Sequence, residues 1–339
     1  MVETRKNGCP FGSHRVIEPE GTLPQAAWKL DNTMEPWENE LLIDVDKLNI
    51  DAASFRQIRE EAGGDTEKIK DIILRTVAQR GKQHNPVTGS GGMLLGSVNR
   101  AGGNFPGKVT PGERIATLVS LSLTPLRIDR ILDVDEERDQ VRIEGRAILF
   151  ESGIFAPIPD DLSEDFALAM LDVAGAPAQT AKLVRPGQTV LVIGGGGKSG
   201  LLCMYEAQRR AGVTGRVVGV SYSEGGCGRI RGSGFADVIL QADATRPLDF
   251  HHAVTGALNG DLADITINCV DVPGTEMASI LVTRDGGTIY FFSMATSFTS
   301  AALGAEGAGK DVRMLIGNGY TRGHAQIVLD IARKVQHLF

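Results

Sequence analysis

Four consecutive glycines, at positions 194–197, constrain the fold of this chain more than any other stretch. They follow the short apolar run "TVLVI" at 189–193 and precede "SGLLCMYEAQRRAG", whose composition is that of a helix ending at Gly212. A continuous apolar run of this length, bounded by glycine, is typical of a buried strand. The segment therefore predicts a strand, a tight turn and a helix in immediate succession.

Two kinds of phosphate site use such a turn. The ATP-binding loop requires G-x-x-x-x-G-K-[ST], and its first glycine would fall on Val192 inside the strand, so that pattern fails. The alternative, G-x-G-x-x-G, is met by Gly195, Gly197 and Gly200. These glycines allow a tight turn, close approach to a pyrophosphate and close helix packing. The spacing predicts a dinucleotide site with the pyrophosphate beside Lys198 and Ser199.

The second part of the chain, residues 159–339, is predicted to be a Rossmann domain. Ser163 is a plausible cap for a helix that follows it. Short apolar runs then recur with room for crossover helices between them, at 189–193, 216–220, 237–240, 264–270, 287–293 and 312–317. Alternating strands and helices indicate a parallel, doubly wound sheet.

The first part, residues 1–158, is predicted to be rich in β-structure. Runs with strand-like composition and partial alternation occur at 40–50, 114–123, 126–135 and 140–150. Between the first two lies a predicted helix at 65–81, in which four apolar side chains share one face: Ile69, Ile72, Ile73 and Val77. The whole chain is therefore expected to be α/β, with a β-rich domain followed by a doubly wound one.

The end of the second strand of the Rossmann domain bears on the choice of cofactor. A carboxylate there would bind the ribose 2′-hydroxyl of NAD, but the sequence has Ser221, closely followed by Ser223. Arg229 and Arg231 would suit the 2′-phosphate of NADP, or they are solvated arginines on a helix. The residues alone leave NAD and NADP open. Later strand ends are expected to line the nicotinamide with Asn268, Cys269, Val270 and Ser293.

Composition and charge exclude other classes of function. With 35 Lys and Arg against 42 Asp and Glu, the chain has a formal net charge of −7, and its cations are scattered. A nucleic-acid surface needs a dense basic patch, so none is expected. The sequence has neither a secretory signal nor about 18 consecutive apolar residues, and no C-x-x-C pair. A cytoplasmic protein that binds neither nucleic acid nor membrane is expected.

Several segments resemble the medium-chain dehydrogenase/reductase superfamily. They are "PGERIATL" at 111–118, "PDDLSEDFALAML" at 159–171, "PGQTVLVIGGGGKSGLL" at 186–202, "DITINCV" at 264–270 and "MLIGNGYTRGHAQIVLDIAR" at 314–333. The resemblance implies a GroES-like β-rich domain that precedes the Rossmann domain. It also implies a homodimer, which is common in the superfamily.

A narrower resemblance is to the L-erythro-3,5-diaminohexanoate dehydrogenase family. It is carried by "GSHRVIEPEGTLPQAAWKLDN", "LLIDVDKLNIDAASF" and "GNGYTRGHAQIVLDIARK". It implies oxidative deamination of the 3-amino group with NAD, in bacterial lysine fermentation, which yields 5-amino-3-oxohexanoate and ammonia. Two alternatives stay open on the residues: a zinc-free quinone or enone reductase that uses NADPH, and a non-catalytic nucleotide-binding protein.

The sequence departs from the zinc-dependent members of the superfamily. Those carry a cysteine in the loop after the first long strand, where this chain has Asp51, and a histidine where it has Ser90. A catalytic zinc needs about three protein ligands and a structural zinc four. The sequence therefore predicts an enzyme without zinc, although a metal between Asp51 and His84 is the alternative.

The implied reaction assigns candidate roles to four residues. An ammonium has no lone pair with which to form an imine as hydride leaves, so a base must first take a proton. Asp51 is the first candidate base, or a helix cap, and Ser90 could orient the attacking water. Glu306 is expected at the carboxyl edge of the sheet, paired with the C5 ammonium, and Arg127 is expected to bind the carboxylate. Otherwise Glu306 is a solvated loop residue and Arg127 decorates a strand.

Overall fold

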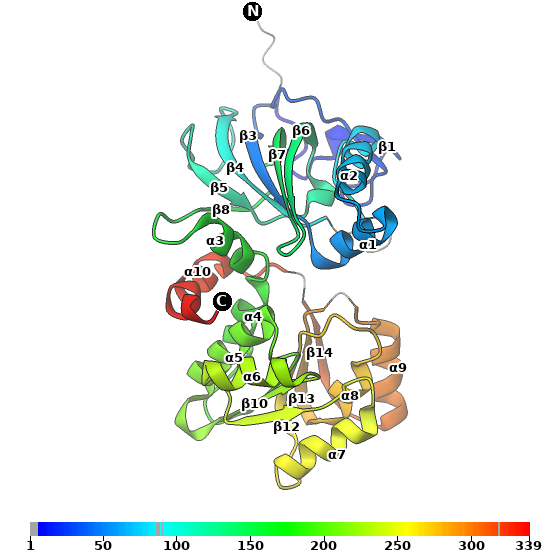
Figure 1. The fold of residues 1–339 in the computed structure, drawn as a ribbon, viewed down its shortest axis with the longest axis vertical. Coiled ribbons are helices and arrows are strands. Elements are labelled where there is room, and N and C mark those ends of the chain that lie inside the picture. The colour runs from blue at the N-terminus through cyan, green and yellow to red at the C-terminus, as the bar shows by residue number, and fades with distance from the viewer. Residues whose placement is uncertain (1–5, 86–88, 90, 294, 318) are drawn as a thin grey trace, which may run out of the picture. The chain divides into compact units, whose positions relative to one another are not determined.

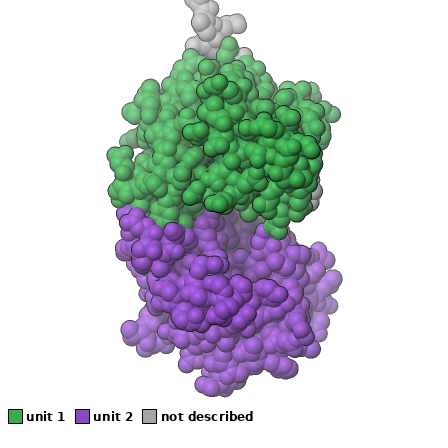
Figure 2. All heavy atoms as spheres, in the orientation of Figure 1, with its two compact units in different colours: residues 1–172 green, residues 173–339 purple. Residues whose placement is uncertain are grey.

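The computed structural model describes residues 6–85, 89, 91–293, 295–317 and 319–339. The chain forms two compact units, unit 1 over Met1–Asp172 and unit 2 over Val173–Phe339, which Figure 2 distinguishes by colour. Each unit has its own sheet and its own apolar core. None of the helices in the described ranges is long and apolar enough to cross a membrane.

Unit 1 is built on a six-stranded antiparallel sheet, which confirms the predicted β-rich first domain (Figure 1). In spatial order its strands are β6 (Leu126–Asp135), β7 (Gln140–Leu149), β3 (Leu41–Asn49), β4 (Met93–Ala101), β5 (Arg114–Thr117) and β8 (Phe155–Pro157). The short strands β1 (Val16–Glu18) and β2 (Lys29–Leu30) form a separate pair, and the 3-10 turns of this unit are η1 (Ser13–Arg15) and η2 (Leu121–Leu123).

Two helices of unit 1 follow β3 and close its core. Helix α1 (Ala52–Ala62) is capped by Asp51, and α2 (Thr66–Arg80) is capped by Asp65. Both end at a glycine in the left-handed region, Gly63 or Gly81, which satisfies the last carbonyl groups. The predicted helix at 65–81 is confirmed, and its buried side chains join those of the sheet in one core.

The last helix of unit 1, α3 (Glu164–Leu171), begins at the predicted cap, where Ser163 Oγ accepts the Phe166 N–H at 3.3 Å. Arg114 on β5 forms an ion pair with Glu164, with Nε 2.7 Å from Oε1, and Lys47 on β3 forms another with Asp165. These contacts join α3 to the antiparallel sheet. Compact unit 1 therefore runs on to Asp172, past the boundary expected after residue 158.

Unit 2 is the predicted doubly wound sheet, with six strands that are all parallel. In spatial order they are β11 (Val238–Gln241), β10 (Arg216–Ser221), β9 (Thr189–Ile193), β12 (Ala263–Asn268), β13 (Thr283–Phe291) and β14 (Arg313–Ile316). Numbered from β9, this is the order 3-2-1-4-5-6 of dinucleotide-binding domains. The strand order reverses between β9 and β12, and ligands bind at the carboxyl ends of the strands at such a point.

Helices cover both faces of the parallel sheet (Figure 1). Side chains of α4 (Gly175–Leu183), α5 (Lys198–Ala211) and α6 (Glu224–Ser233) share a core with one face. Those of α7 (Pro247–Ala257), α8 (Glu276–Leu281) and α9 (Phe298–Ala308) pack on the other. Helix α10 (His324–Val335) contacts α4 and α5, and the 3-10 turns η3 (Gly212–Thr214) and η4 (Gln336–Leu338) complete the unit.

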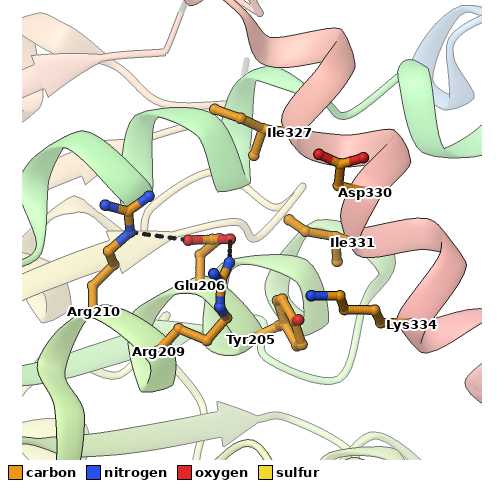
Figure 3. Close-up of a pocket in the computed structure, with 8 residues that line it drawn as sticks. All are labelled: Tyr205, Glu206, Arg209, Arg210, Ile327, Asp330, Ile331 and Lys334. Atoms are coloured by element: carbon orange, nitrogen blue, oxygen red, sulfur yellow. Dashed lines mark hydrogen bonds and ion pairs between the residues drawn. The ribbon is translucent and has the colours of Figure 1, made fainter.

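A shallow hollow lies where α5 meets α10 (Figure 3). The buried carboxylate of Glu206 lies at its base, held by Arg209 Nη1 at 2.7 Å and Arg210 Nε at 3.3 Å. The other lining residues are Tyr205, Ile327, Asp330, Ile331 and Lys334. Glu206 lies about two and a half turns along α5 from the glycine loop, so the hollow is separate from the dinucleotide site.

Candidate active site

The glycine loop, residues 194–197, has the geometry that a dinucleotide requires. Gly194 makes the turn with a φ of +80°, and the N–H groups of Gly194 and Gly195 both donate to the Val220 carbonyl, at 3.0 and 2.9 Å. A Cβ on Gly200 would lie 2.3 Å from the Gly194 oxygen, so α5 packs against the turn more closely than alanine would allow. The predicted role of Gly200 in helix packing is therefore confirmed.

The N-terminus of α5 begins directly after the glycine loop. Gly197 is the exposed N-cap residue, and it makes no side-chain cap hydrogen bond. The N–H groups in the first turn of a helix have no partner within the helix, and its dipole favours negative charge there. This is the kind of helix end at which the sequence predicts a pyrophosphate, in front of Gly197, Lys198 and Ser199.

The glycine loop is also bound to the helix that follows β10. A Cβ on Gly196 would lie 2.6 Å from the Cα of Gly226, so the two backbones touch. Arg229 on α6 donates from Nε to the Gly196 carbonyl at 2.7 Å. Ser223 caps α6 by accepting the Gly226 N–H at 3.1 Å.

The arginines that could select NADP already have other partners. Besides the bond from Arg229 to the loop, Arg231 forms an ion pair with Glu224, with Nη1 3.6 Å from Oε1, and both side chains are well exposed. Ser221, at the end of β10, is nearly buried, and a Cβ on Gly226 would meet its Oγ at 2.0 Å. The ribose-binding end of β10 thus carries hydroxyl groups in place of the expected carboxylate.

The ends of β12 and β13 lie at the carboxyl edge of the sheet, where β12 borders the point at which the strand order reverses. Asn268 is fully buried, and its Nδ2 donates to Thr275 Oγ1 at 2.9 Å and to Ser279 Oγ at 3.0 Å, while its Oδ1 accepts the Val270 N–H. Its side chain therefore shapes the strand end from within unit 2. Ser293 Oγ accepts the Ala295 N–H at 3.1 Å, just beyond β13.

Cys269 packs against a second thiol. Its Sγ lies 4.0 Å from the Sγ of Cys203 on α5, and a hydrogen bond between the two thiols, together with burial, raises the pKa of Cys269 well above its ordinary value. A thiol that holds its proton is a poor nucleophile. Cys269 is therefore a poor candidate for covalent chemistry, and its expected place beside the nicotinamide stays a prediction.

In unit 1, Asp51 is both a helix cap and part of a polar network. Its Oδ1 accepts the Ser54 N–H at 3.0 Å and its Oδ2 accepts the Ser54 hydroxyl at 2.5 Å. Asn85 in turn donates to Ser54 Oγ at 3.0 Å, and both Ser54 and Asn85 are buried, while Asp51 is partly exposed. The carboxylate is therefore held in one orientation with one side toward solvent.

The segment that carries Asn85 also contains two perturbed bases. Lys82 is fully buried and donates from Nζ to the Pro24 carbonyl at 2.7 Å; burial, with help from nearby Arg80, lowers the pKa of Lys82 to about 8. Burial and the charges of Lys82 and Arg80 lower the pKa of His84 to about 4. His84 is therefore a neutral imidazole at pH 7, with a buried Nδ1 that has no hydrogen-bond partner among the described residues. Perturbed groups of this kind gather at functional sites.

Gly92 brings the chain after this segment against Asp51. It has a φ of +91°, and a Cβ there would lie 2.0 Å from the Asn49 oxygen and 2.8 Å from the Asp51 nitrogen. Only glycine permits this approach. Ser90, the predicted water-orienting residue, lies outside the described residues.

The structure does not bring Arg127 to Asp51. Arg127 on β6 pairs across the sheet with Arg146, which pairs with Asp44 on β3, five residues before Asn49. At the rise of a strand, this row lies about 15 Å from the end of β3 that leads to Asp51. The Arg127 side chain is 43% exposed, with Nε 3.1 Å from Asp129 Oδ1. This is the arrangement expected of an exposed strand residue without a role in binding.

The predicted placement of Glu306 at the carboxyl edge is wrong. Glu306 lies near the end of α9, which connects β13 to the parallel strand β14. A crossover helix runs back toward the amino edge of the sheet, so only its first residues lie near the carboxyl ends of the strands. Glu306 is exposed at the opposite edge from the glycine loop, because the sequence reading took a helix for a loop.

Sequence reasoning missed several residues of both sites. Gly194, not Gly195, makes the turn, and Gly226 makes the contact between α6 and the loop. The four-glycine run and the Gly225–Gly226 pair were visible signals of close backbone approach. Lys82 and Asn85 had no such signal, because single polar residues in a loop do not reveal burial.

Together the two units define a class of protein. An antiparallel β domain, followed by a Rossmann sheet with a glycine loop, is the arrangement of medium-chain dehydrogenases and reductases. The structure resembles CurK enoyl reductase, with a TM-score of 0.59 over 91% of this chain and 83% of the other, at 16% identity. It also resembles an Escherichia coli quinone oxidoreductase solved with NADPH, with a TM-score of 0.57 over 91% and 83%, at 13% identity. At these identities the likeness concerns the fold alone.

Sequence comparison gives the particular family. The chain is 58% identical to L-erythro-3,5-diaminohexanoate dehydrogenase from Acetoanaerobium sticklandii over 96% of both chains. It is 56% identical to the enzyme of that name from Fusobacterium nucleatum, over 97% of this chain and 96% of the other. The N-terminal domain of the same dehydrogenase matches residues 14–159. The chain belongs to the L-erythro-3,5-diaminohexanoate dehydrogenase family, which confirms the resemblance seen in the sequence.

Proposed function

We propose that this protein oxidatively deaminates L-erythro-3,5-diaminohexanoate with NAD, forming 5-amino-3-oxohexanoate and ammonia. The observation that carries the proposal is the 58% identity to a dehydrogenase of that name across 96% of both chains. The quinone and enoyl reductases share the fold at only 13% and 16% identity. They therefore give no comparable support for a reductase acting on quinones or enones.

A nicotinamide dinucleotide fits the carboxyl edge of unit 2. The turn at Gly194 leaves no room for a Cβ on Gly200, and the open first turn of α5 provides N–H donors for a pyrophosphate. A nicotinamide held there would supply the acceptor for the hydride that leaves C3 of the substrate. We propose NAD rather than NADP because Arg229 is bonded to the loop and Arg231 is paired with Glu224.

Asp51 is our proposed base for the chemistry at C3. The substrate amine must lose a proton before hydride leaves, and water must later lose one as it adds to the iminium carbon. Ser54 holds both carboxylate oxygens of Asp51 from one side, and the residue stays partly exposed. Asn85 donates to the Ser54 hydroxyl in turn, so the network holds Asp51 in one orientation.

Turnover with a matched set of substrates tests the proposal. Purified protein is incubated with NAD and L-erythro-3,5-diaminohexanoate, and both the absorbance of reduced nicotinamide and the released ammonia are followed. We expect equal amounts of the two products, and slower reaction with 3-aminohexanoate or with NADP. Activity with quinones or enones and NADPH, without ammonia release from the diamino acid, would instead support the reductase.

A further inference from the structure

The junction between the glycine loop and α6 has a feature that cofactor binding in general does not require. The Gly196 carbonyl, in the middle of the loop, accepts a hydrogen bond from Arg229 Nε at 2.7 Å. Gly196 is buried, and its backbone lies against that of Gly226, where a Cβ would come within 2.6 Å of the Gly226 Cα. The loop and the first two turns of α6 are thus joined by both packing and a charged donor.

The guanidinium of Arg229 suits this place for physical reasons. A guanidinium is a planar, charged group whose donors bind a carbonyl in a fixed direction. A charged donor makes a stronger hydrogen bond than a neutral one. The other end of the loop is fixed by the Val220 carbonyl, which accepts both the Gly194 and the Gly195 N–H groups. Loss of Arg229 would leave the buried Gly196 carbonyl without this donor.

We propose that Arg229 is a positioning residue that holds the Gly196 carbonyl and thereby fixes the glycine loop for the pyrophosphate of the dinucleotide. The proposal rests on the proposed function only in taking a nicotinamide dinucleotide as the ligand. It differs from recognition of a 2′-phosphate, because NAD and NADP have the same pyrophosphate. Arg229 therefore supports both dinucleotides equally and does not select between them.

Calorimetric titration of the full-length protein with NAD, and separately with NADP, measures this directly and needs no turnover. For Arg229→Ala we expect Kd to rise about tenfold or more for both ligands, equivalent to about 1.4 kcal/mol, with the ratio of the two Kd values unchanged. In the activity assay, KM for NAD should rise while kcat at saturating NAD is kept. Methylguanidinium added to the variant should restore part of the affinity.

Arg231→Ala is the matched control, since Arg231 lies on the same helix but pairs with the exposed Glu224. The Kd of Arg231→Ala for NAD should equal that of the protein without substitutions. Should Arg229→Ala fail to fold, Arg229→Lys answers the same question: it keeps the charge but loses the planar Nε donor, so both affinities should fall together.

Two results would overturn the assignment. Weaker NADP binding with unchanged NAD binding would make Arg229 a reader of the 2′-phosphate, and unchanged binding of both would leave it without a role in the site. If the protein without substitutions binds neither dinucleotide, the proposed function is refuted as well. Turnover of some other substrate, with intact NAD binding, would refute only the proposed substrate.

Discussion

At the scale of single residues, Asp51 has one role that the structure shows, as a helix cap, and one that we propose, as a base. It caps α1 through Ser54, and it is the partly exposed carboxylate of a network that includes buried Asn85. The sequence supported either a cap or a base. The two roles are compatible, because each carboxylate oxygen can accept a second hydrogen bond besides the one from Ser54.

Substitution of Asp51 can separate these roles. Asparagine caps a helix about as well as aspartate, but its Nδ2 cannot accept the Ser54 hydroxyl, so Asp51→Asn should lower the melting temperature slightly while kcat falls by about 10²-fold or more. Asp51→Ala should lose activity and, in addition, about 1 kcal/mol of unfolding free energy. Asp65→Asn, at the cap of α2, is the control for kcat. Full activity in Asp51→Asn would restrict Asp51 to capping.

His84 should make the stability of the protein depend on pH. Its pKa in the folded protein is lowered from 6.5 to about 4, so between these values the unfolded chain binds the proton more tightly. Unfolding free energy should therefore fall as the pH drops from about 6.5 toward 4. Urea titrations at several pH values should show that His84→Gln loses less unfolding free energy over this pH range than the original protein does. His252→Gln, which alters an exposed histidine of α7, is the control and should lose as much as the original protein. Identical pH profiles for the unchanged protein and His84→Gln would contradict the prediction.

Charge alone did not reveal where two of the candidate residues lie in the sheets. Glu306 and Arg127 were chosen for their charge, and charge says nothing about which edge or face of a sheet a residue occupies. Glu306 belongs to a helix whose far end lies at the amino edge, and Arg127 to a mid-strand row of exposed charges. Lys82 shows the converse: a lysine on a surface-like stretch is fully buried, because Pro24 and Gln25 provide carbonyl acceptors.

At the scale of elements, the sequence was most informative where the apolar pattern was strongest. The predicted strands at 189–193 and 126–135 coincide with β9 and β6, because both are bounded by glycine, proline or charged turns. Strand β4 was missed, since its glycine and polar residues hide the alternation. The predicted strand at 114–123 ends at Thr117 and continues as a 3-10 turn at 121–123, where Ser120 acts as the cap.

The two later glycines of the motif should respond differently to alanine. A Cβ on Gly200 would lie 2.3 Å from a backbone oxygen, so Gly200→Ala should lower the unfolding free energy by about 1–3 kcal/mol. Gly197 is exposed, with a φ of −87° and 3.4 Å to the nearest atom, so Gly197→Ala should cost less than about 1 kcal/mol. Its methyl group would instead obstruct the pyrophosphate. Calorimetric titration should show that Gly197→Ala remains folded but no longer binds NAD. Equal losses of unfolding free energy in Gly197→Ala and Gly200→Ala would contradict the separate roles given to the two glycines.

At the scale of the whole molecule, the glycine run determined most of what could be predicted. Once it was assigned to a dinucleotide turn, the strand that precedes it had to be the first of a doubly wound sheet, and the β-rich part before it had to be a separate domain. The observed 3-2-1-4-5-6 order and the two separate cores agree with this. The substrate could not be derived in this way, because it depends on side chains placed by loops, such as those near Asp51.

Activity should survive removal of metal ions. A catalytic zinc takes about three protein ligands, commonly Cys, His or a carboxylate. Within the described ranges, nowhere do three side chains of His, Cys, Asp or Glu gather as such a site, and the Cys203–Cys269 pair provides only two donors. The proton transfers proposed for Asp51 need no Lewis acid. Dialysis against EDTA or phenanthroline should therefore leave kcat unchanged, with elemental analysis of the active protein as the companion measurement. Stoichiometric zinc whose removal abolishes activity, and whose return restores it, would show that a metal site includes residues outside those ranges or forms only when the substrate is bound.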